Sequence, residues 1–293
     1  MNSSQDLVSI PTADGSFTFL SPEFNEAFHS LHGAQQEAQR KFVEPILSKR
    51  PYQSLKLLDI CYGLGYNTAA ALTAIWTSNP NCHVQLWGLE LNAAVPDIAL
   101  KQGFLNIWPA DIQQLTTLLA TQYHAKTDRL EAKLLIGDAR QSIQQVYQSG
   151  FRADGVFLDP FSPPHCPQLW TVEFLSWVVR CLQPTGRLAT YSCSAAVRTA
   201  LLAARCQIGS TYPVGRRSPG TVASLLQTDL PPLSPQEQEH LLTRAAVPYR
   251  DPSLSDPAEL ILQRRRAEQQ TSDLERTTQW KKRWLNRANV EAL

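Results

Sequence analysis

Long apolar runs, paired cysteines and an excess of charge are all missing from this sequence of 293 residues. No apolar run approaches the ~20 residues that a membrane helix needs, so no membrane partner is expected. The N-terminus lacks a basic region followed by an apolar one, which argues against a secretory signal. The six cysteines are scattered without a C-x-x-C pair. The sequence therefore predicts no disulfide framework and no structural zinc site, and a reducing, cytoplasmic location.

The formal net charge of +1 neither requires nor excludes a nucleic acid, because a local basic patch can bind phosphates on a neutral protein. The apolar fraction of 43% and the charged fraction of 18% are ordinary for a globular protein. The length suits one large α/β domain with a smaller appendage.

Apolar strands and amphipathic helices alternate through the middle of the chain. Strands are predicted at about 55–60, 83–89, 132–137, 154–159 and 186–191, with helices between them. This alternation predicts a mostly parallel sheet with helices on both faces. Two later runs, 206–214 and 221–227, are joined too closely for a parallel crossover. They predict an antiparallel hairpin at the edge of the sheet.

The chain divides into three expected parts. Residues 1–50 form a hairpin around Asp14-Gly15 and a helix near 34–47, which together cover the site. Residues 51–229 form the α/β domain. Residues 230–293 form a proline-rich linker and a basic helical tail, with eight Lys or Arg against three acids between 264 and 287.

A glycine turn follows the first long strand, and acids end that strand and the next. Asp59 closes the first strand, Gly63 and Gly65 form the turn, and Glu90 ends the next strand. The carboxyl ends of parallel strands meet at one crevice, where Glu90 is placed to bind the hydroxyls of a ribose. Thr68 stands where a dinucleotide-binding turn has its third glycine or an alanine. Asp59 suits an ammonium group better than a pyrophosphate, because like charges repel. These features favour S-adenosyl-L-methionine as the ligand.

The pattern resembles motif I of class I methyltransferases, with Cys61 in place of the usual first glycine. The predicted fold is therefore the Rossmann-like class I fold, a seven-stranded mostly parallel sheet with an antiparallel edge strand. The resemblance implies that Asp59, Cys61, Gly63, Gly65, Asn67, Glu90, Asp138 and Asp159 bind the cofactor. It places the adenine amino group on Asp138, which is otherwise simply the N-cap of the next helix.

Asp159-Pro160-Phe161-Ser162 resembles the Asp-Pro-Pro-Tyr type motif of methyltransferases that act on amino groups. An alkyl ammonium has a pKa of about 10, and it attacks a methyl group only after losing a proton. Asp159 is therefore the candidate that orients the amine or relays the proton. The Pro160 carbonyl is a candidate acceptor for a second N–H, and Phe161 offers a face to a base or cation.

Together these motifs resemble one family, the methyltransferase part of the tRNA 5-methylaminomethyl-2-thiouridine biosynthesis protein and its standalone relatives. The resemblance runs from about Thr12 to Leu226. Its motifs include Gly33-Ala34-x-x-Glu37-Ala38, the glycine turn, Leu158-Asp159-Pro160-Phe161-Ser162-Pro163 and Pro167-Gln168-Leu169-Trp170-Thr171. It implies methylation of 5-aminomethyl-(2-thio)uridine at the tRNA wobble position. The flavin oxidase domain of the bifunctional proteins is not in this sequence, so a separate enzyme is expected to supply the aminomethyl group.

Candidate substrate residues are His165, a departure from the family pattern, and the phosphate-binding candidates Arg198, Arg216 and Arg217. The basic tail is a further phosphate-binding candidate, or else a solvated helix face that packs two tryptophans. No metal site is predicted. Two alternatives stay open: an N-methyltransferase or aminopropyltransferase-like enzyme that acts on a small amine, and a non-catalytic module that binds the cofactor.

Overall fold

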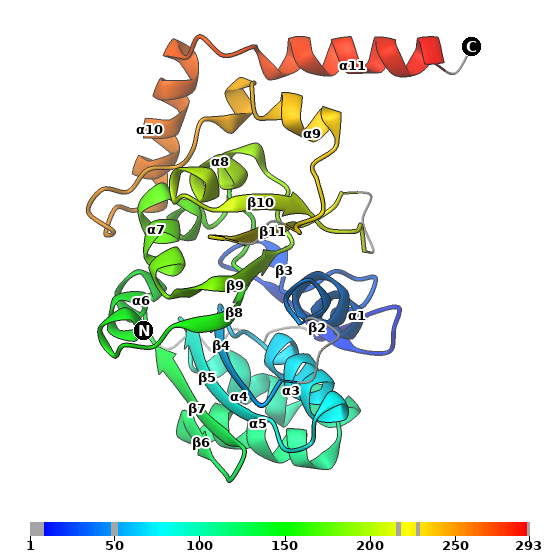
Figure 1. The fold of residues 1–293 in the computed structure, drawn as a ribbon, viewed down its shortest axis with the longest axis vertical. Helices are drawn as coiled ribbons and strands as arrows, with labels where there is room; N and C mark the ends of the chain where they lie inside the picture. The colour runs from blue at the N-terminus through cyan, green and yellow to red at the C-terminus, as the bar shows by residue number, and fades with distance from the viewer. Residues whose placement is uncertain (1–8, 48–51, 215–217, 227–228, 292–293) are drawn as a thin grey trace.

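The centre of the protein, seen in a computed structural model that describes residues 9–47, 52–214, 218–226 and 229–291, is an eight-stranded sheet (Figure 1). The strand order is β10-β11-β9-β8-β4-β5-β7-β6, and β9, β8, β4, β5 and β7 run parallel. The predicted α/β class is confirmed. The strands are β4 (Ser54–Ile60), β5 (His83–Glu90), β6 (His124–Lys126), β7 (Leu130–Ile136), β8 (Ala153–Leu158), β9 (Leu182–Thr190), β10 (Gln207–Ser210) and β11 (Thr221–Ser224).

The sheet has one strand more than the seven predicted. The additional strand, β6, has three residues and pairs antiparallel with β7 at one edge. A run this short carries no readable alternation of apolar and polar residues. At the other edge, β10 and β11 form the predicted antiparallel pair. Two strands therefore run against the parallel set: β6, which lies at an edge, and β11, which lies between β10 and β9.

Helices cover both faces of the sheet, and each face has its own apolar core. One core joins the sheet to α3 and α5, and the other joins it to α6, α7 and α8. The central strand β4 is apolar on both faces, with Leu57, Leu58 and Ile60 fully buried. A parallel strand that lies between two layers of helices requires this pattern. The helices are α3 (Tyr66–Ser78), α4 (Ala94–Lys101), α5 (Ala110–Gln122), α6 (Ala139–Gln148), α7 (Val172–Arg180) and α8 (Ala195–Ala203), with short 3₁₀ turns at Phe104–Ile107 and Pro167–Trp170.

The N-terminal segment is the predicted hairpin and helix, and the hairpin turn caps the helix. The Asp14 carboxylate accepts the Gln36 N–H at 2.9 Å, and the Ser16 hydroxyl accepts the Ala34 N–H at 2.9 Å. These contacts satisfy backbone donors that a helix start leaves open. The elements are β1 (Ser9–Pro11), β2 (Phe17–Ser21), β3 (Glu26–Ala27), α1 (Ala34–Glu37), a π-helical turn (Ala38–Val43) and α2 (Glu44–Ile46).

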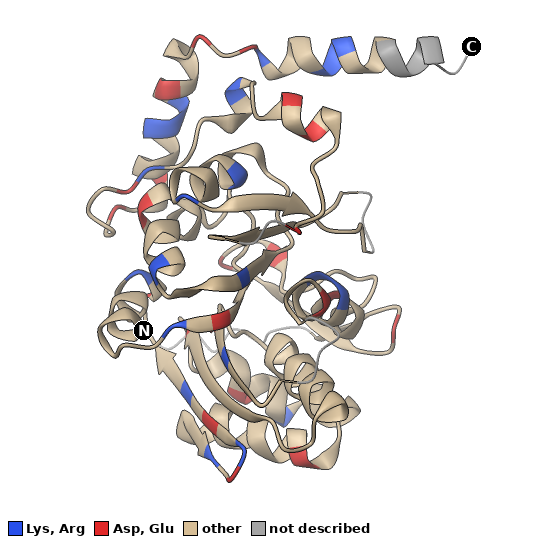
Figure 2. Ribbon diagram, in the orientation of Figure 1, with Lys and Arg blue, Asp and Glu red and all other residues tan. Residues whose placement is uncertain are grey.

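The C-terminal segment packs beside α7 and α8 and then extends along one end of the molecule (Figure 1). Ile261 of α10 is fully buried in the second core. Figure 2 shows Lys and Arg on α10 and α11. No helix among the described residues is long and apolar enough to cross a membrane. The elements are α9 (Pro235–His240), a 3₁₀ turn (Arg244–Ala246), α10 (Ala258–Thr271) and α11 (Thr277–Glu291).

Candidate active site

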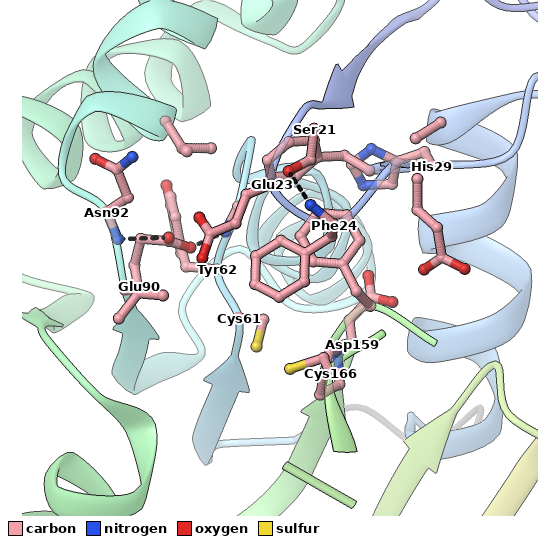
Figure 3. A pocket seen from close by; sticks show the side chains of 18 of the residues that line it. Ser21, Glu23, Phe24, His29, Cys61, Tyr62, Glu90, Asn92, Asp159 and Cys166 are labelled. Atoms are coloured by element: carbon pink, nitrogen blue, oxygen red, sulfur yellow. Dashed lines mark hydrogen bonds between the residues drawn. The ribbon is translucent and has the colours of Figure 1, made fainter. Parts of the chain in front are cut away.

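A cavity of about 440 Å³ opens at the carboxyl ends of the parallel strands (Figure 3). Cys61 after β4, Glu90 at the end of β5 and Asp159 after β8 all line it. The carboxyl ends of these strands thus meet at one cavity, with Glu90 and Asp159 but not Asp59 in its wall. The N-terminal segment contributes residues 21–24 and 26–30 to the cavity wall. The volume is in the range of small-molecule and cofactor sites.

The glycine turn bends through three residues with left-handed backbone conformation. The φ angles are 65° at Cys61, 56° at Gly63 and 84° at Gly65. A Cβ at Gly65 would lie 2.8 Å from the Tyr62 hydroxyl oxygen, so any larger residue would force the Tyr62 ring to shift. Cys61 does carry a side chain, and its conformation costs roughly 1–2 kcal/mol relative to a right-handed one. This backbone geometry is the physical reason for a glycine at the position of Cys61 in the related pattern.

The carboxylate of Glu90 is oriented by two backbone N–H groups. Its Oε2 accepts the Gly63 N–H at 2.8 Å, and its Oε1 accepts the Asn92 N–H at 2.9 Å. Each carboxylate oxygen keeps a second lone pair. Burial raises the pKa of Glu90, opposed by these backbone N–H groups. A ribose with two neighbouring hydroxyls fits this oriented acceptor, so the residues present fit the expected cofactor.

Asp59 does not reach the cavity, which corrects its predicted contact with the cofactor. It is fully buried beneath the turn, where its Oδ2 accepts the Thr68 hydroxyl at 2.7 Å. Its Oδ1 has no hydrogen-bond partner. Burial raises the pKa of Asp59 to about 7. In this structure Asp59 fastens the start of α3 to β4, because Thr68 lies in the first turn of that helix.

Asp159 lines the cavity and is held by Asn67. The Asn67 side-chain N–H donates to Asp159 Oδ2 at 2.9 Å. Burial raises the pKa of Asp159 well above its usual value, and the negative charge of Glu37 adds to this effect. Asn67 orients the Asp159 carboxyl group through this hydrogen bond, although Asn67 itself does not line the cavity. A carboxyl group with a raised pKa is a better proton acceptor near neutral pH.

Pro160 and Phe161 also line the cavity, but both have partners within the protein. The Pro160 carbonyl accepts the Tyr191 hydroxyl at 2.9 Å. One face of Phe161 stacks on Phe24, with ring centroids 4.4 Å apart. Phe28 meets Phe161 edge-on at 5.0 Å. The aromatic surface of the motif is thus shared with the N-terminal segment.

Asp138 and His165 lie outside the cavity wall. Asp138 caps α6, where its side chain accepts the Arg140 N–H at 2.9 Å, and it also pairs with the Arg140 guanidinium. The N-cap alternative is therefore present in the structure. His165 is partly exposed, and its Nδ1 lies 3.3 Å from Glu26 Oε1.

The predicted contact between Arg198 and a tRNA phosphate is not possible in this structure. Arg198 is 2% exposed, and its guanidinium pairs with Glu237 at 2.7 Å. It also donates to the Thr221 hydroxyl at 3.0 Å. Its charge is thus used to join α8 to β11 and to α9. The candidates Arg216 and Arg217 lie outside the described residues.

The sequence alone predicts no role for Glu37, although the residue belongs to the motif Gly33-Ala34-x-x-Glu37-Ala38. The structure places it in the cavity wall, paired with Lys41 at 3.0 Å. The available signal was an acid four residues before a lysine on an otherwise apolar helix face.

Comparisons with known proteins agree with this geometry. A model of the S-adenosyl-L-methionine-dependent methyltransferases matches residues 99–226. The crystal structure of MnmC2 from Aquifex aeolicus is similar, with a TM-score of 0.81 and 33% identity, covering 92% of this chain and 87% of that one. An uncharacterized protein of Methanocaldococcus jannaschii is 30% identical over 89% of this chain and 72% of its own length.

The tRNA 5-methylaminomethyl-2-thiouridine biosynthesis bifunctional protein of Acidovorax sp. is 30% identical over 63% of this chain. The matched region is 30% of that protein's length. The likeness to the bifunctional protein therefore concerns one part of it.

Proposed function

The chain belongs to the S-adenosyl-L-methionine-dependent methyltransferase family that includes the Aquifex aeolicus protein, and we propose that its acceptor is the aminomethyl group of 5-aminomethyl-(2-thio)uridine at the tRNA wobble position. The observation that carries this proposal is Asp159 in the wall of the cavity that also holds Glu90. A carboxylate for an amine and a carboxylate for a ribose thus share one site. The similar protein of Acidovorax sp. is named for the biosynthesis of 5-methylaminomethyl-2-thiouridine in tRNA, which supports this acceptor.

The residues divide the work between donor and acceptor. Glu90 holds the ribose, and Gly63 lets the backbone approach the ligand closely. When bound, S-adenosyl-L-methionine would supply a sulfonium methyl group, which a neutral amine attacks in line so that the neutral thioether leaves. Asp159 takes one proton from the substrate ammonium and orients the lone pair that this exposes. The new C–N bond forms as the C–S bond breaks, and the positive charge passes to the methylated amine.

Two further assignments follow from the acceptor. A tRNA substrate places the enzyme in the cytoplasm. The methylation needs an aminomethyl group that a preceding reaction must form, and we assign that preceding reaction to a separate enzyme. Residues 1–50 act as the cover of the site in this proposal, residues 51–229 as the methyltransferase domain, and residues 230–293 as a linker and basic tail.

Nucleoside mass spectrometry tests the proposal. Total tRNA is digested from cells with and without the gene, and the aminomethyl and methylaminomethyl forms of the wobble nucleoside are measured. Loss of the gene should remove the methylated form and accumulate the aminomethyl form, and the purified protein with S-adenosyl-L-methionine should convert one into the other. Unchanged nucleosides in both experiments would show that the acceptor is a different amine.

A further inference from the structure

The N-terminal segment brings a second carboxylate, Glu37, into the cavity wall that holds Asp159. Glu37 is 8% exposed, and both of its oxygens have partners. Oε2 accepts the Ser30 N–H at 2.8 Å, and Oε1 accepts the Lys41 ammonium at 3.0 Å. Lys41 is only 1% exposed and does not line the cavity. Glu37 therefore lines the cavity, while its ion-pair partner Lys41 is buried behind the cavity wall.

The two carboxyl groups have pKa shifts of opposite sign. Burial raises the pKa of Glu37, but Lys41 and the Ser30 N–H outweigh it, so the net pKa is lowered. The pKa of Asp159 is raised by burial and by the charges of Glu37 and Asp59, against the opposing effects of Asn67 and Lys41.

Other titratable side chains line the same wall, including His29, Glu23, Glu26, Cys61, Tyr62 and Cys166. Burial lowers the pKa of His29, although Glu37 and Asp14 oppose the effect. A neutral imidazole adds no positive charge. Glu37 and Asp159 therefore give the wall an anion that stays ionised and a carboxyl group that readily takes a proton, and such separated pairs are typical of acid–base sites.

We propose that Glu37 is a positioning residue that binds the ammonium form of the acceptor beside Asp159; this inference rests on the proposed function. An ammonium group has three N–H donors, and Asp159 needs only one of them for the proton transfer. The Glu37 carboxylate accepts a hydrogen bond from a second N–H group of the ammonium and stays ionised throughout the reaction. Figure 3 shows Glu90 and Asn92 at one end of the cavity and His29 and Asp159 at the other. The carboxylate that holds the donor ribose is thus separated from Asp159.

The variant Glu37→Gln tests the role, because glutamine keeps an acceptor for the Ser30 N–H but removes the charge. We expect KM for aminomethyl tRNA to rise about 10- to 100-fold, the range for a lost charge-assisted hydrogen bond. Removal of the neighbouring charge should also shift the acid limb of the kcat/KM profile to lower pH. Binding of S-adenosyl-L-methionine, measured by calorimetry, should not change. Glu44→Gln removes the same charge from an exposed position of the same helical segment and should leave KM and the pH profile as they are.

A double variant separates this role from folding, because Glu37→Gln alone leaves Lys41 buried without its partner. Glu37→Gln/Lys41→Met removes both charges, a change that buried ion pairs often tolerate. It should fold, as followed by circular dichroism, and show the same increase in KM.

If the wild type methylates aminomethyl tRNA while a folded variant keeps the wild-type KM and acid limb, the role of Glu37 is wrong and the proposed function stands. A loss of S-adenosyl-L-methionine binding with unchanged KM for tRNA overturns it too, as does a double variant that cannot fold. A wild type inactive on this tRNA contradicts both proposals.

Discussion

Asp59, Glu90 and Asp159 all lie at the carboxyl ends of parallel strands, but they differ in burial and in hydrogen-bond partners. Glu90 is oriented by two backbone N–H groups in the cavity, and Asp59 is buried beneath the turn. Asp159 lines the cavity together with a further carboxylate, Glu37. In the sequence all three are an acid after an apolar run. Burial and hydrogen-bond partners separate them, and those depend on residues far away in the chain.

The proton acceptor can be tested by Asp159→Asn. We expect kcat to fall by about 10²–10⁴, the usual contribution of general acid–base catalysis, with little change in S-adenosyl-L-methionine affinity. In the wild type the rate should fall as the pH drops through the raised pKa of Asp159, since a protonated carboxyl group cannot take another proton. The variant should lose this acid limb. Asp128→Asn, an exposed residue near β6, is the matched control. A retained limb would assign proton transfer to another group.

Asp59 predicts a pH dependence of stability. Its pKa is raised to about 7 in the folded protein, so its contribution to stability is fully present below the unfolded pKa and is lost as the pH rises through about 7. Asp59→Asn should therefore stabilise the protein more at about pH 8 than at about pH 5, with a difference of roughly 2–3 kcal/mol by linkage. Urea unfolding of both proteins at the two pH values measures it. An equal effect at both values would contradict the raised pKa.

At the scale of elements, the long periodic segments were predicted well and the short or irregular ones were not. The parallel strands, their helices and the antiparallel pair β10–β11 follow from patterns within about ten residues. The three residues of β6 were missed because their pairing with β7 is a contact of the fold. The π-helical turn at Ala38–Val43 was also missed, since its sequence has the same apolar spacing as an α-helix.

Arg198 joins three elements, and its loss should therefore reduce stability and not tRNA recognition. Arg198→Met leaves Glu237 without its buried partner, and we expect the free energy of unfolding to fall by roughly 3–5 kcal/mol. Denaturant unfolding measures this loss. The salt dependence of tRNA binding should remain as in the wild type. A shallower dependence with unchanged stability would restore Arg198 as a phosphate contact.

At the scale of the whole molecule, the basic tail is partly used by the fold. Arg265 donates to the Val247 carbonyl at 2.7 Å, and Arg283 pairs with Glu275 at 2.9 Å. Trp280 is buried and stacks on His240, with ring centroids 4.5 Å apart, which is the packing alternative of the sequence prediction. Lys281 and Lys282 remain exposed on α11, where a tRNA backbone can reach them.

These two lysines test the tRNA-binding role of the tail. Lys281→Gln/Lys282→Gln should weaken tRNA binding and reduce the slope of log K against log salt by about two, one for each lost phosphate contact. Lys126→Gln removes an exposed lysine from β6, at the opposite end of the molecule in Figure 1, and should leave the slope unchanged. A wild-type affinity that hardly varies with salt would favour a small amine as the acceptor.

The sequence by itself determined the fold class, the glycine turn and the nature of the methyl donor, because these depend on residues that are neighbours in the chain. It also predicts Asp159-Pro160-Phe161 as the acceptor motif. Only the tertiary structure decided that Asp59 and Arg198 are buried and that Glu37 shares a cavity with Asp159. The physical reason is that burial and electrostatic environment arise from packing between distant segments, which no local pattern records.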